Sequence, residues 1–320
     1  MIYKKEIFCT LGPSTINKDF LKFSNNNISL LRLNMSHLDV KKLKSTIIFI
    51  RKFSKIPICI DTEGAQIRTK VRKSKKYKIN QFFTLSKDKG NFNVYPKEVF
   101  CKIKKNDILS IGFDGLEAKI VKTISNKLTC KVIREGLMEN NKGVHLVNRN
   151  IKLSFLTKKD IMAISIAKKM RINYFALSFT NSHRDILNFN KILKNKVKIY
   201  KIETKNALRN LKKIIHNGEK FLIDRGDLSK SVSIEMLPFV QSKILKIANK
   251  ENKKVYVATN FLESMIKNKQ PNRGEANDIY HTLKLGAAGL VLAAETAIGK
   301  HPKECVNFLI KIIKIYNRYR

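Results

Sequence analysis

The chain has 320 residues, of which 43% are hydrophobic, so it can form one large core and a smaller second domain, and intrinsic disorder is excluded. No apolar stretch approaches the length of a membrane span, the first residues lack the apolar core of a secretory signal, and the five cysteines form no C-x-x-C pair. These features disfavour a membrane protein, a disulfide-stabilised secreted protein and a structural zinc site. We expect a cytoplasmic protein.

The formal net charge of +40 is extreme. Such a charge can indicate nucleic-acid binding. Lysines are spread over every segment, however, and no basic helix carries interleaved aromatic residues, so a bias of the whole chain towards Lys, Asn and Ile is the favoured interpretation. We expect no nucleic-acid partner, and we expect the excess charge to attract anionic substrates.

Short apolar runs alternate with amphipathic stretches of helical length along most of the chain. The predicted strands are residues 6–10, 29–34, 56–62, 174–179, 197–203, 220–226, 255–260 and 289–295. The predicted helices are residues 40–53, 159–171, 184–193, 207–216, 236–249, 275–285 and 302–315. Eight strands that alternate with helices predict an α/β protein with a (β/α)₈ TIM barrel.

Residues 70–150 interrupt this alternation and are too many for a loop. They contain short β-like runs at 82–85, 108–111, 118–123 and 128–132. We predict a small β-barrel domain at 70–150, inserted after the third strand, and a discontinuous barrel domain made of residues 1–69 and 151–320. Because the insertion interrupts a strand-to-helix connection, we expect it on the catalytic face, where it could act as a lid.

Charged residues follow two neighbouring predicted strands. Lys201-Ile202-Glu203 ends one apolar run, and Arg225-Gly226-Asp227 ends the next. The catalytic groups of such barrels lie at the carboxyl ends of the strands. Two carboxylates from successive strands can share one hard cation, and an adjacent lysine can bind a phosphate that the cation also holds. The pattern therefore predicts phosphoryl or enolate chemistry.

Further motifs follow the other strands. They are Thr10-Leu11-Gly12-Pro13-Ser14, Arg32-Leu33-Asn34-Met35-Ser36-His37, Asp61-Thr62-Glu63-Gly64-Ala65-Gln66-Ile67-Arg68-Thr69, Thr259-Asn260-Phe261-Leu262-Glu263-Ser264-Met265, Pro271-Asn272-Arg273-Gly274-Glu275-Ala276 and Glu295-Thr296-Ala297. In this order and spacing they closely resemble the pyruvate kinase family, from about residue 5 to about residue 302. The inserted segment matches more weakly, in Gly115 and Lys142-Gly143-Val144.

The resemblance implies a phosphotransferase of glycolysis that moves the phosphoryl group of phosphoenolpyruvate to ADP, giving pyruvate and ATP through a Mg²⁺-stabilised enolate. Glu203 and Asp227 would be the Mg²⁺ ligands, and Lys201 would stabilise the same substrate oxygens. Arg32 would hold the transferred phosphoryl group. Backbone N–H groups around Gly226 and Asp227 would bind the substrate carboxylate.

The resemblance also implies roles for residues at other strand ends. Thr259 occupies the position of the proton-delivering hydroxyl and would contact the substrate. The K⁺ ligands would be Asn34, Ser36, Asp61 and the Thr62 carbonyl, an oxygen-only set suited to a hard cation. The nucleotide-contacting positions are Pro13, Asn34, His37, Arg68 and Lys142.

Several positions depart from the family. Asp224 replaces the usual Ala and adds a negative charge near an anionic substrate, unless Arg225 or the metal neutralises it. Ser229, Ser231 and Ala293 are further replacements, and the one at Ala293 removes a hydroxyl that the family places near the substrate. Gln66 falls where family members carry Glu or Lys according to their K⁺ dependence, so that dependence stays open.

Typical members of the family continue into a further domain that carries allosteric sites and a subunit interface, whereas this sequence ends at Arg320. We therefore expect no allosteric control through such a domain, and a homo-oligomer would have to form through the barrel. Two alternatives stay open. One is a divergent barrel enzyme that uses the same metal–enolate site on another 2-oxo acid or phosphoenol substrate. The other is a non-catalytic relative that binds a metabolite.

Overall fold

The computed structural model describes residues 5–88, 90–112, 115–149, 151 and 153–319. The chain forms two compact units, which we call the barrel unit (Met1–Gly64 and Lys158–Arg320) and the inserted unit (Ala65–Thr157). The first boundary falls at Gly64 and not at residue 69, because strand β4 (Ile67–Val71) pairs with strands of the inserted unit. Within the described ranges, no helix is both long enough and apolar enough to cross a membrane.

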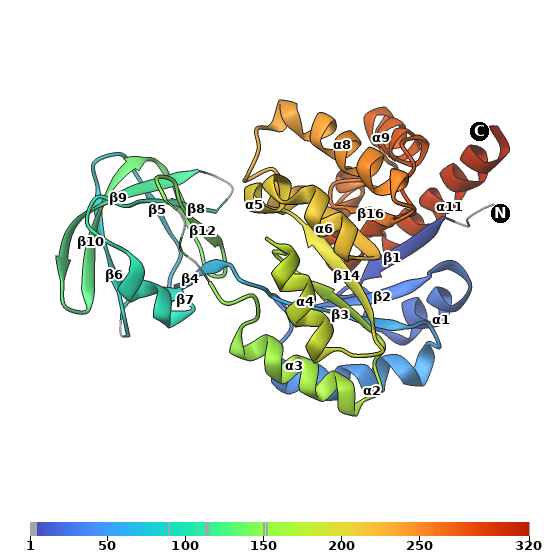
Figure 1. The fold of residues 1–320 in the computed structure, drawn as a ribbon, viewed down its shortest axis with the longest axis horizontal. Coiled ribbons are helices and arrows are strands. Elements are labelled where there is room, and N and C mark those ends of the chain that lie inside the picture. The colour runs from blue at the N-terminus through green and yellow to red at the C-terminus, as the bar shows by residue number, and fades with distance from the viewer. Residues whose placement is uncertain (1–4, 89, 113–114, 150, 152, 320) are drawn as a thin grey trace. The chain divides into compact units, whose positions relative to one another are not determined.

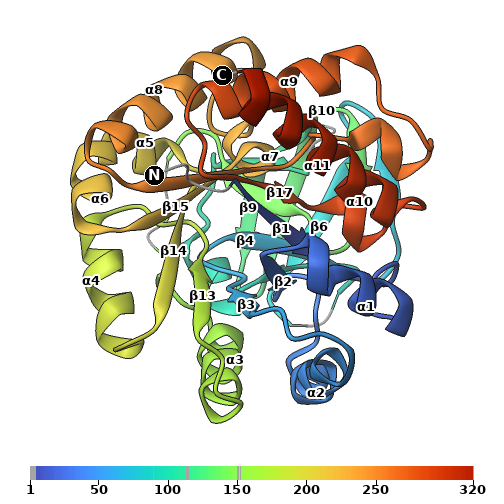
Figure 2. The same ribbon diagram turned by 90° about the vertical axis from the view of Figure 1, so that its right-hand side faces the viewer.

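The barrel unit contains a closed barrel of eight parallel strands, which confirms the predicted TIM barrel (Figures 1 and 2). In chain order the strands are β1 (Glu6–Thr10), β2 (Leu30–Asn34), β3 (Ile58–Asp61), β13 (Tyr174–Leu177), β14 (Val197–Ile202), β15 (Lys220–Asp224), β16 (Lys254–Ala258) and β17 (Gly289–Leu292). Each strand pairs with the next in this order, and β17 pairs with β1 to close the barrel. All eight carboxyl ends therefore open on one face.

Helices surround this barrel (Figure 2). They are α1 (Lys18–Asn27), η1 (Val40–Lys42), α2 (Leu43–Phe53), α3 (Lys158–Lys169), α4 (His183–Ile192), α5 (Lys205–Arg209), α6 (Leu211–Asn217), α7 (Arg225–Leu228), η3 (Ile234–Met236), α8 (Leu237–Lys250), η4 (Glu263–Ile266), α9 (Arg273–Lys284), α10 (Ala294–Ala297) and α11 (Pro302–Tyr319). Helix α1 was not predicted, since it ends in three asparagines of low helix propensity. Buried Phe20 and Leu21 and an N-cap at Asn17 stabilise it nevertheless.

The interior of the barrel is a packed core and not a pore. Its cluster draws on every strand: Phe8, Leu30, Cys59, Ala176, Ile199, Leu222, Tyr256, Ala258 and Val291. Because side chains alternate between the two faces of a strand, the residue two positions further along points the same way. On these strands, the residue two positions after a residue of this cluster therefore also points inward, and it lies nearer the open carboxyl face.

The inserted unit is a second closed barrel with its own apolar core. Its strands are β4 (Ile67–Val71), β6 (Phe82–Ser86), β7 (Phe92–Tyr95), β8 (Ile108–Ile111), β9 (Leu116–Ile124), β10 (Lys127–Arg134) and β12 (Gly143–Leu146), and β5 (Lys75–Tyr77) pairs separately with β11 (Gly136–Met138). A 3₁₀ helix, η2 (Lys97–Lys102), follows β7. Strand β5 was not predicted, because it is three residues long and begins with two lysines.

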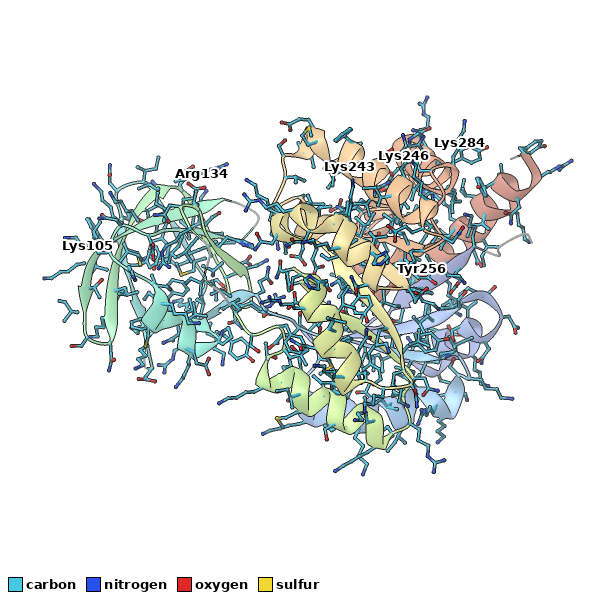
Figure 3. All side chains as sticks on the ribbon, viewed as in Figure 1. Lys105, Arg134, Lys243, Lys246, Tyr256 and Lys284 are labelled. Atoms are coloured by element: carbon cyan, nitrogen blue, oxygen red, sulfur yellow. The ribbon has the colours of Figure 1, made fainter. Side chains whose placement is uncertain are left out.

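Basic side chains cover the outside of both units. Lys243 and Lys246 on α8 and Lys284 on α9 are exposed, as are Lys105 and Arg134 of the inserted unit (Figure 3). This distribution agrees with a charge bias of the whole sequence. The expected absence of a nucleic-acid partner stays a prediction.

Candidate active site

Four buried charged residues occupy equivalent positions on four strands of the barrel. Each follows a residue of the interior cluster by two positions: Arg32 follows Leu30, Asp61 follows Cys59, Lys201 follows Ile199 and Asp224 follows Leu222. Strand alternation therefore turns all four side chains inward at the open carboxyl face. These four side chains form a layer of charged groups, which we call the charged layer, next to the apolar interior cluster.

Arg32 and Asp61 form a buried ion pair across neighbouring strands β2 and β3. Arg32 Nε donates to Asp61 Oδ2 at 2.7 Å, and Nη2 contacts the same oxygen. Arg32 Nη1 also donates to the hydroxyl of Thr10 at 2.9 Å. These contacts fix the guanidinium in one orientation at the mouth of the barrel.

Lys201 lies at the centre of the charged layer. Its Nζ is 3.1 Å from Glu203 Oε2, 3.2 Å from Asp224 Oδ2 and 3.5 Å from Asp61 Oδ2, and it donates to Ser178 Oγ at 3.2 Å. Burial alone would lower the pKa of Lys201, yet the carboxylates of Asp61, Glu203 and Asp224 raise it. Lys201 is therefore a permanent positive charge and not a proton donor or acceptor at neutral pH.

Asp224 points into the site. Its Oδ1 accepts a hydrogen bond from the Thr259 hydroxyl at 2.7 Å, and its Oδ2 is close to both Lys201 and Arg32. Burial alone would raise the pKa of Asp224, but Lys201 and Arg32 hold it well below its ordinary value. Arg225, a candidate for neutralising this charge, instead forms an ion pair with Asp278 at 2.7 Å.

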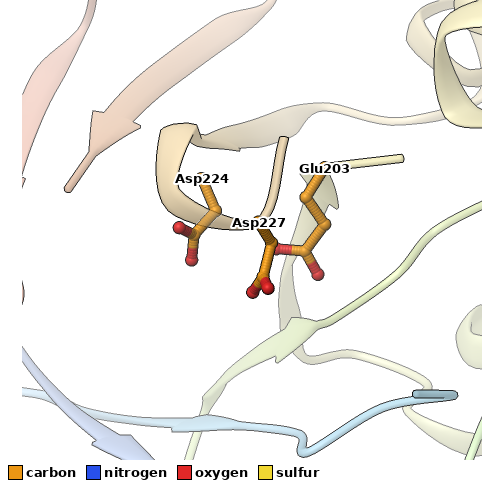
Figure 4. Close-up of side chains that lie close together, drawn as sticks. All are labelled: Glu203, Asp224 and Asp227. Atoms are coloured by element: carbon orange, nitrogen blue, oxygen red, sulfur yellow. The ribbon is translucent and has the colours of Figure 1, made fainter. Parts of the chain in front are cut away.

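Three carboxylates gather beside Lys201. Glu203, Asp224 and Asp227 each offer an oxygen within 4.8 Å of the others (Figure 4). Oxygen donors of this kind suit a hard divalent cation such as Mg²⁺. Asp227 is also tied to Lys230, whose Nζ donates to its Oδ1 at 2.7 Å.

Glu203 provides the strongest indication that a cation fits here. Its Oε1 accepts the backbone N–H of Phe179 at 2.6 Å, whereas its buried Oε2 accepts no hydrogen bond from the part of the chain that is described; its nearest partner is the ammonium of Lys201. Burial raises the pKa of Glu203 to about 8, with Lys201 opposing the rise and the charges of Asp227 and Asp224 adding to it. A divalent cation would both bind Oε2, which now has only the Lys201 ammonium beside it among the described residues, and relieve this repulsion.

Thr259 and Gly226 lie side by side near Asp224. A Cβ atom at Gly226 would lie 3.0 Å from Thr259 Cγ2, so a larger residue there would require the Thr259 side chain to shift. Thr259 has a φ angle of +81°, which is rare for a β-branched residue and costs on the order of 1–3 kcal/mol. Arg225 holds the strained residue, because its Nε donates to the Thr259 carbonyl at 2.9 Å.

The predicted K⁺ ligands come from the adjacent ends of β2 and β3. Asn34 is opposite Asp61 in the strand register, and Asn34 Oδ1 accepts the backbone N–H of Ser36 at 2.9 Å. The Thr62 carbonyl accepts a hydrogen bond from the Ser178 hydroxyl at 2.7 Å. The set is thus assembled at the adjacent ends of β2 and β3, and the side chains of Asn34 and Asp61 and the Thr62 carbonyl already have protein partners.

The predicted nucleotide contacts divide between the two units. In the barrel unit, Pro13 and His37 follow the neighbouring strands β1 and β2, next to Asn34. In the inserted unit, Arg68 lies on β4 opposite Gly143, and Lys142 Nζ is 3.0 Å from Glu139 Oε2. Each unit by itself therefore brings its own members together.

Two polar residues of the site had no role assigned to them from the sequence. Ser178 follows β13, and its hydroxyl donates to the Thr62 carbonyl at 2.7 Å or to Asp61 Oδ1 at 3.2 Å and accepts from Lys201. Asp160, in the first turn of α3, accepts the backbone N–H groups of Glu63 and Gly64 at 2.7 and 3.1 Å and so fixes the turn after β3. The signal for Ser178 was its place at the carboxyl end of a strand, whereas Asp160 carried no such signal.

The sequence was compared with known families and proteins. A family model described as "Pyruvate kinase, barrel domain" matches residues 2–306. The pyruvate kinase of Thermotoga maritima is 32% identical over 97% of this chain and 70% of its own length. That of Clostridium perfringens is 30% identical, also over 97% of this chain and 70% of its own length. That of Staphylococcus saprophyticus is 29% identical over 97% of this chain, which spans 56% of that protein.

Proposed function

This chain belongs to the pyruvate kinase family, and from that premise we propose that it transfers the phosphoryl group of phosphoenolpyruvate to ADP, giving pyruvate and ATP. One observation carries the proposal. A buried lysine and a buried arginine at the open end of the barrel lie beside a carboxylate cluster that suits a divalent cation. Anionic phosphoryl and enol oxygens need this combination of charges.

Glu203 and Asp227 would hold Mg²⁺, and the assignment is supported by Oε2 of Glu203, which is buried and accepts no hydrogen bond among the described residues. When bound, the metal supplies positive charge to the phosphoryl and enol oxygens. Arg32, oriented by Asp61, binds the phosphoryl group while it moves from the enol oxygen to ADP. Lys201 stabilises the negative charge left on the enol oxygen, and its permanent protonation suits that role.

Thr259 would deliver the proton that converts the enolate into pyruvate. Its hydroxyl lies beside Gly226, where backbone N–H groups would bind the substrate carboxylate. Asn34, Ser36, Asp61 and the Thr62 carbonyl would form a K⁺ site. Pro13, His37, Asn34, Arg68 and Lys142 would contact the nucleotide.

A coupled assay for pyruvate tests the proposal. Purified chain is mixed with phosphoenolpyruvate, ADP and Mg²⁺, with and without K⁺, and pyruvate formation is followed. We expect formation that depends on all three of phosphoenolpyruvate, ADP and Mg²⁺. The absence of pyruvate at saturating substrate, in protein whose circular dichroism shows an intact fold, would contradict the proposal.

The position of Asp224 favours a second candidate function. A carboxylate that points into the site, and does not pair with Arg225, suits a substrate other than phosphoenolpyruvate. In that case the same metal–enolate site would act on another 2-oxo acid. Decarboxylation of oxaloacetate or proton exchange of a 2-oxo acid, at rates above those of pyruvate formation, would favour this alternative.

A further inference from the structure

The side chain of Asp224 lies close to Lys201, Arg32 and Thr259, three residues that we propose to bind the substrate. Asp224 Oδ2 is 3.2 Å from Lys201 Nζ and 3.9 Å from Arg32 Nη2, and Asp224 Oδ1 accepts a hydrogen bond from the Thr259 hydroxyl at 2.7 Å. An entering phosphoryl or enol oxygen would need the same donors, because carboxylate and phosphoryl oxygens are both acceptors.

The two cations have other partners that satisfy them. Arg32 is held by Asp61 through Nε at 2.7 Å and through Nη2. Lys201 is 3.1 Å from Glu203 and 3.5 Å from Asp61. Asp224 is therefore an additional acceptor at this position, beside Asp61 and Glu203.

We propose, on the basis of the proposed function, that Asp224 acts as an internal anion that competes with the phosphoryl substrate for Lys201 and Arg32 and thereby lowers the affinity of the site for that substrate. Two effects contribute. The carboxylate satisfies donors that the substrate needs, and its negative charge repels an anion brought close to it. Asp224 also accepts a hydrogen bond from the Thr259 hydroxyl. This hydrogen bond must break before Thr259 can deliver its proton to a substrate.

Asp224 is less suited to the metal than Glu203. Both oxygens of Asp224 already have partners, one in Thr259 and the other in Lys201 and Arg32. Glu203 Oε2 lies 3.1 Å from the same ammonium, so what distinguishes Asp224 is its hydrogen bond with the Thr259 hydroxyl and its proximity to Arg32. These contacts favour a role for Asp224 as an anion that pairs with Lys201 and Arg32 over a role as a third metal ligand.

The test measures anion binding directly, without turnover. Isothermal titration calorimetry in the presence of a chelator gives the Kd of inorganic phosphate and of phosphoenolpyruvate for the full chain, Asp224→Asn and Asp224→Ala. We expect at least tenfold tighter binding of both anions by Asp224→Ala. We expect a smaller gain for Asp224→Asn, because the amide oxygen can still accept from Thr259 and fills the same space.

Glu219→Gln is the matched control. Glu219 directly precedes β15, so it lies at the opposite end of the strand that carries Asp224, and its side chain is 82% exposed. The substitution changes the net charge by the same amount, and we expect anion affinities equal to those of the unmodified chain. If Glu219→Gln bound the anions as tightly as the Asp224 variants do, the effect would be due to net charge, and the proposal would be overturned.

Two other results would also overturn it. One is anion binding that is unchanged or weaker in both Asp224 variants. The other is loss of Mn²⁺ binding in Asp224→Asn to the extent found for Glu203→Gln, which would make Asp224 a metal ligand. Pyruvate formation is measured separately. If no variant forms pyruvate, the proposed function fails, while a gain in anion affinity still supports the role of Asp224.

Discussion

The backbone N–H of Phe179 donates to Oε1 of Glu203 at 2.6 Å and fixes that carboxylate in a buried position. Phe179 has a φ angle of +53°, so the donor belongs to a strained residue two positions after β13. The second oxygen of Glu203 faces other carboxylates and the ammonium of Lys201. Without a cation, Glu203 is thus held in a place that disfavours its own charge.

The substitution Glu203→Gln should stabilise the metal-free protein. The amide oxygen can still accept the N–H of Phe179, while the buried charge and its repulsion from Asp227 disappear. We expect the free energy of unfolding to rise by about 1–3 kcal/mol without metal and the stabilisation by Mg²⁺ to be lost. Chemical denaturation with and without Mg²⁺ measures both, with Glu219→Gln as the control. A less stable variant that still responds to Mg²⁺ would contradict the assignment.

The stability of the metal-free protein should fall as the pH rises from about 5 to 8. The pKa of Glu203 is raised in the folded state from 4.5 to about 8, so the folded state binds a proton that the unfolded state has released. The stabilising effect is complete below the unfolded pKa and is lost as the pH passes the folded pKa, with a slope of up to about 1.4 kcal/mol per pH unit. The lowered pKa of Asp224 acts below this window. The difference between the unmodified chain and Glu203→Gln isolates the effect, and saturating Mg²⁺ should remove it. If the difference in unfolding free energy between the two proteins did not change with pH, the raised pKa of Glu203 would be contradicted.

The sequence pattern was sufficient for the eight-stranded barrel, because each strand is apolar, short and followed by an amphipathic helix. It was also sufficient to place Lys201 and Asp61 at the carboxyl face. The strand period could have placed Asp224 as well, since it follows the interior residue Leu222 by two positions. The partner of Asp224 was beyond prediction, because the choice among Arg225, Lys201 and Arg32 depends on side-chain geometry across three strands.

Some residues of the motifs that resemble the pyruvate kinase family stabilise the fold. Glu295 accepts the backbone N–H groups of Ala293 at 2.7 Å and Leu262 at 3.3 Å, and so joins the loops after β17 and β16. Gly12 lies so close to Ala297 that a Cβ atom would be 2.5 Å from its carbonyl oxygen. These roles depend on contacts between distant segments, which no local pattern reveals.

Glu275 is the clearest case of a motif residue that acts on stability. Its carboxylate accepts the backbone N–H of Asn272 at 2.9 Å, which closes a capping box on α9, and it also accepts the N–H and the hydroxyl of Ser264 at 2.7 and 2.6 Å. We expect Glu275→Ala to cost about 2–3 kcal/mol of unfolding free energy, since it leaves partly buried donors unsatisfied.

Glu304→Ala is a matched control for this loss, because Glu304 occupies the same third position in the first turn of α11. Its contribution there should be limited to the helix dipole, about 0.3–1 kcal/mol. Urea denaturation of both variants measures the difference. Equal losses in the two variants would show that the contacts of Glu275 with Ser264 and Asn272 contribute little.

Lys201→Met should abolish most of the phosphoryl transfer. The ammonium lies 3.2 Å from Asp224 and 3.1 Å from Glu203, where the proposed reaction develops negative charge on the enol oxygen. Loss of one such stabilising group reduces kcat by about 10²–10³-fold. Lys198→Met is the control on the same strand, since Lys198 Nζ donates to the carbonyl of Leu193, away from the site. We expect that control to keep its rate of pyruvate formation. If Lys201→Met turned over as fast as Lys198→Met, the charge of Lys201 would have no part in catalysis, and the acidic residues around it would have to be explained by folding alone.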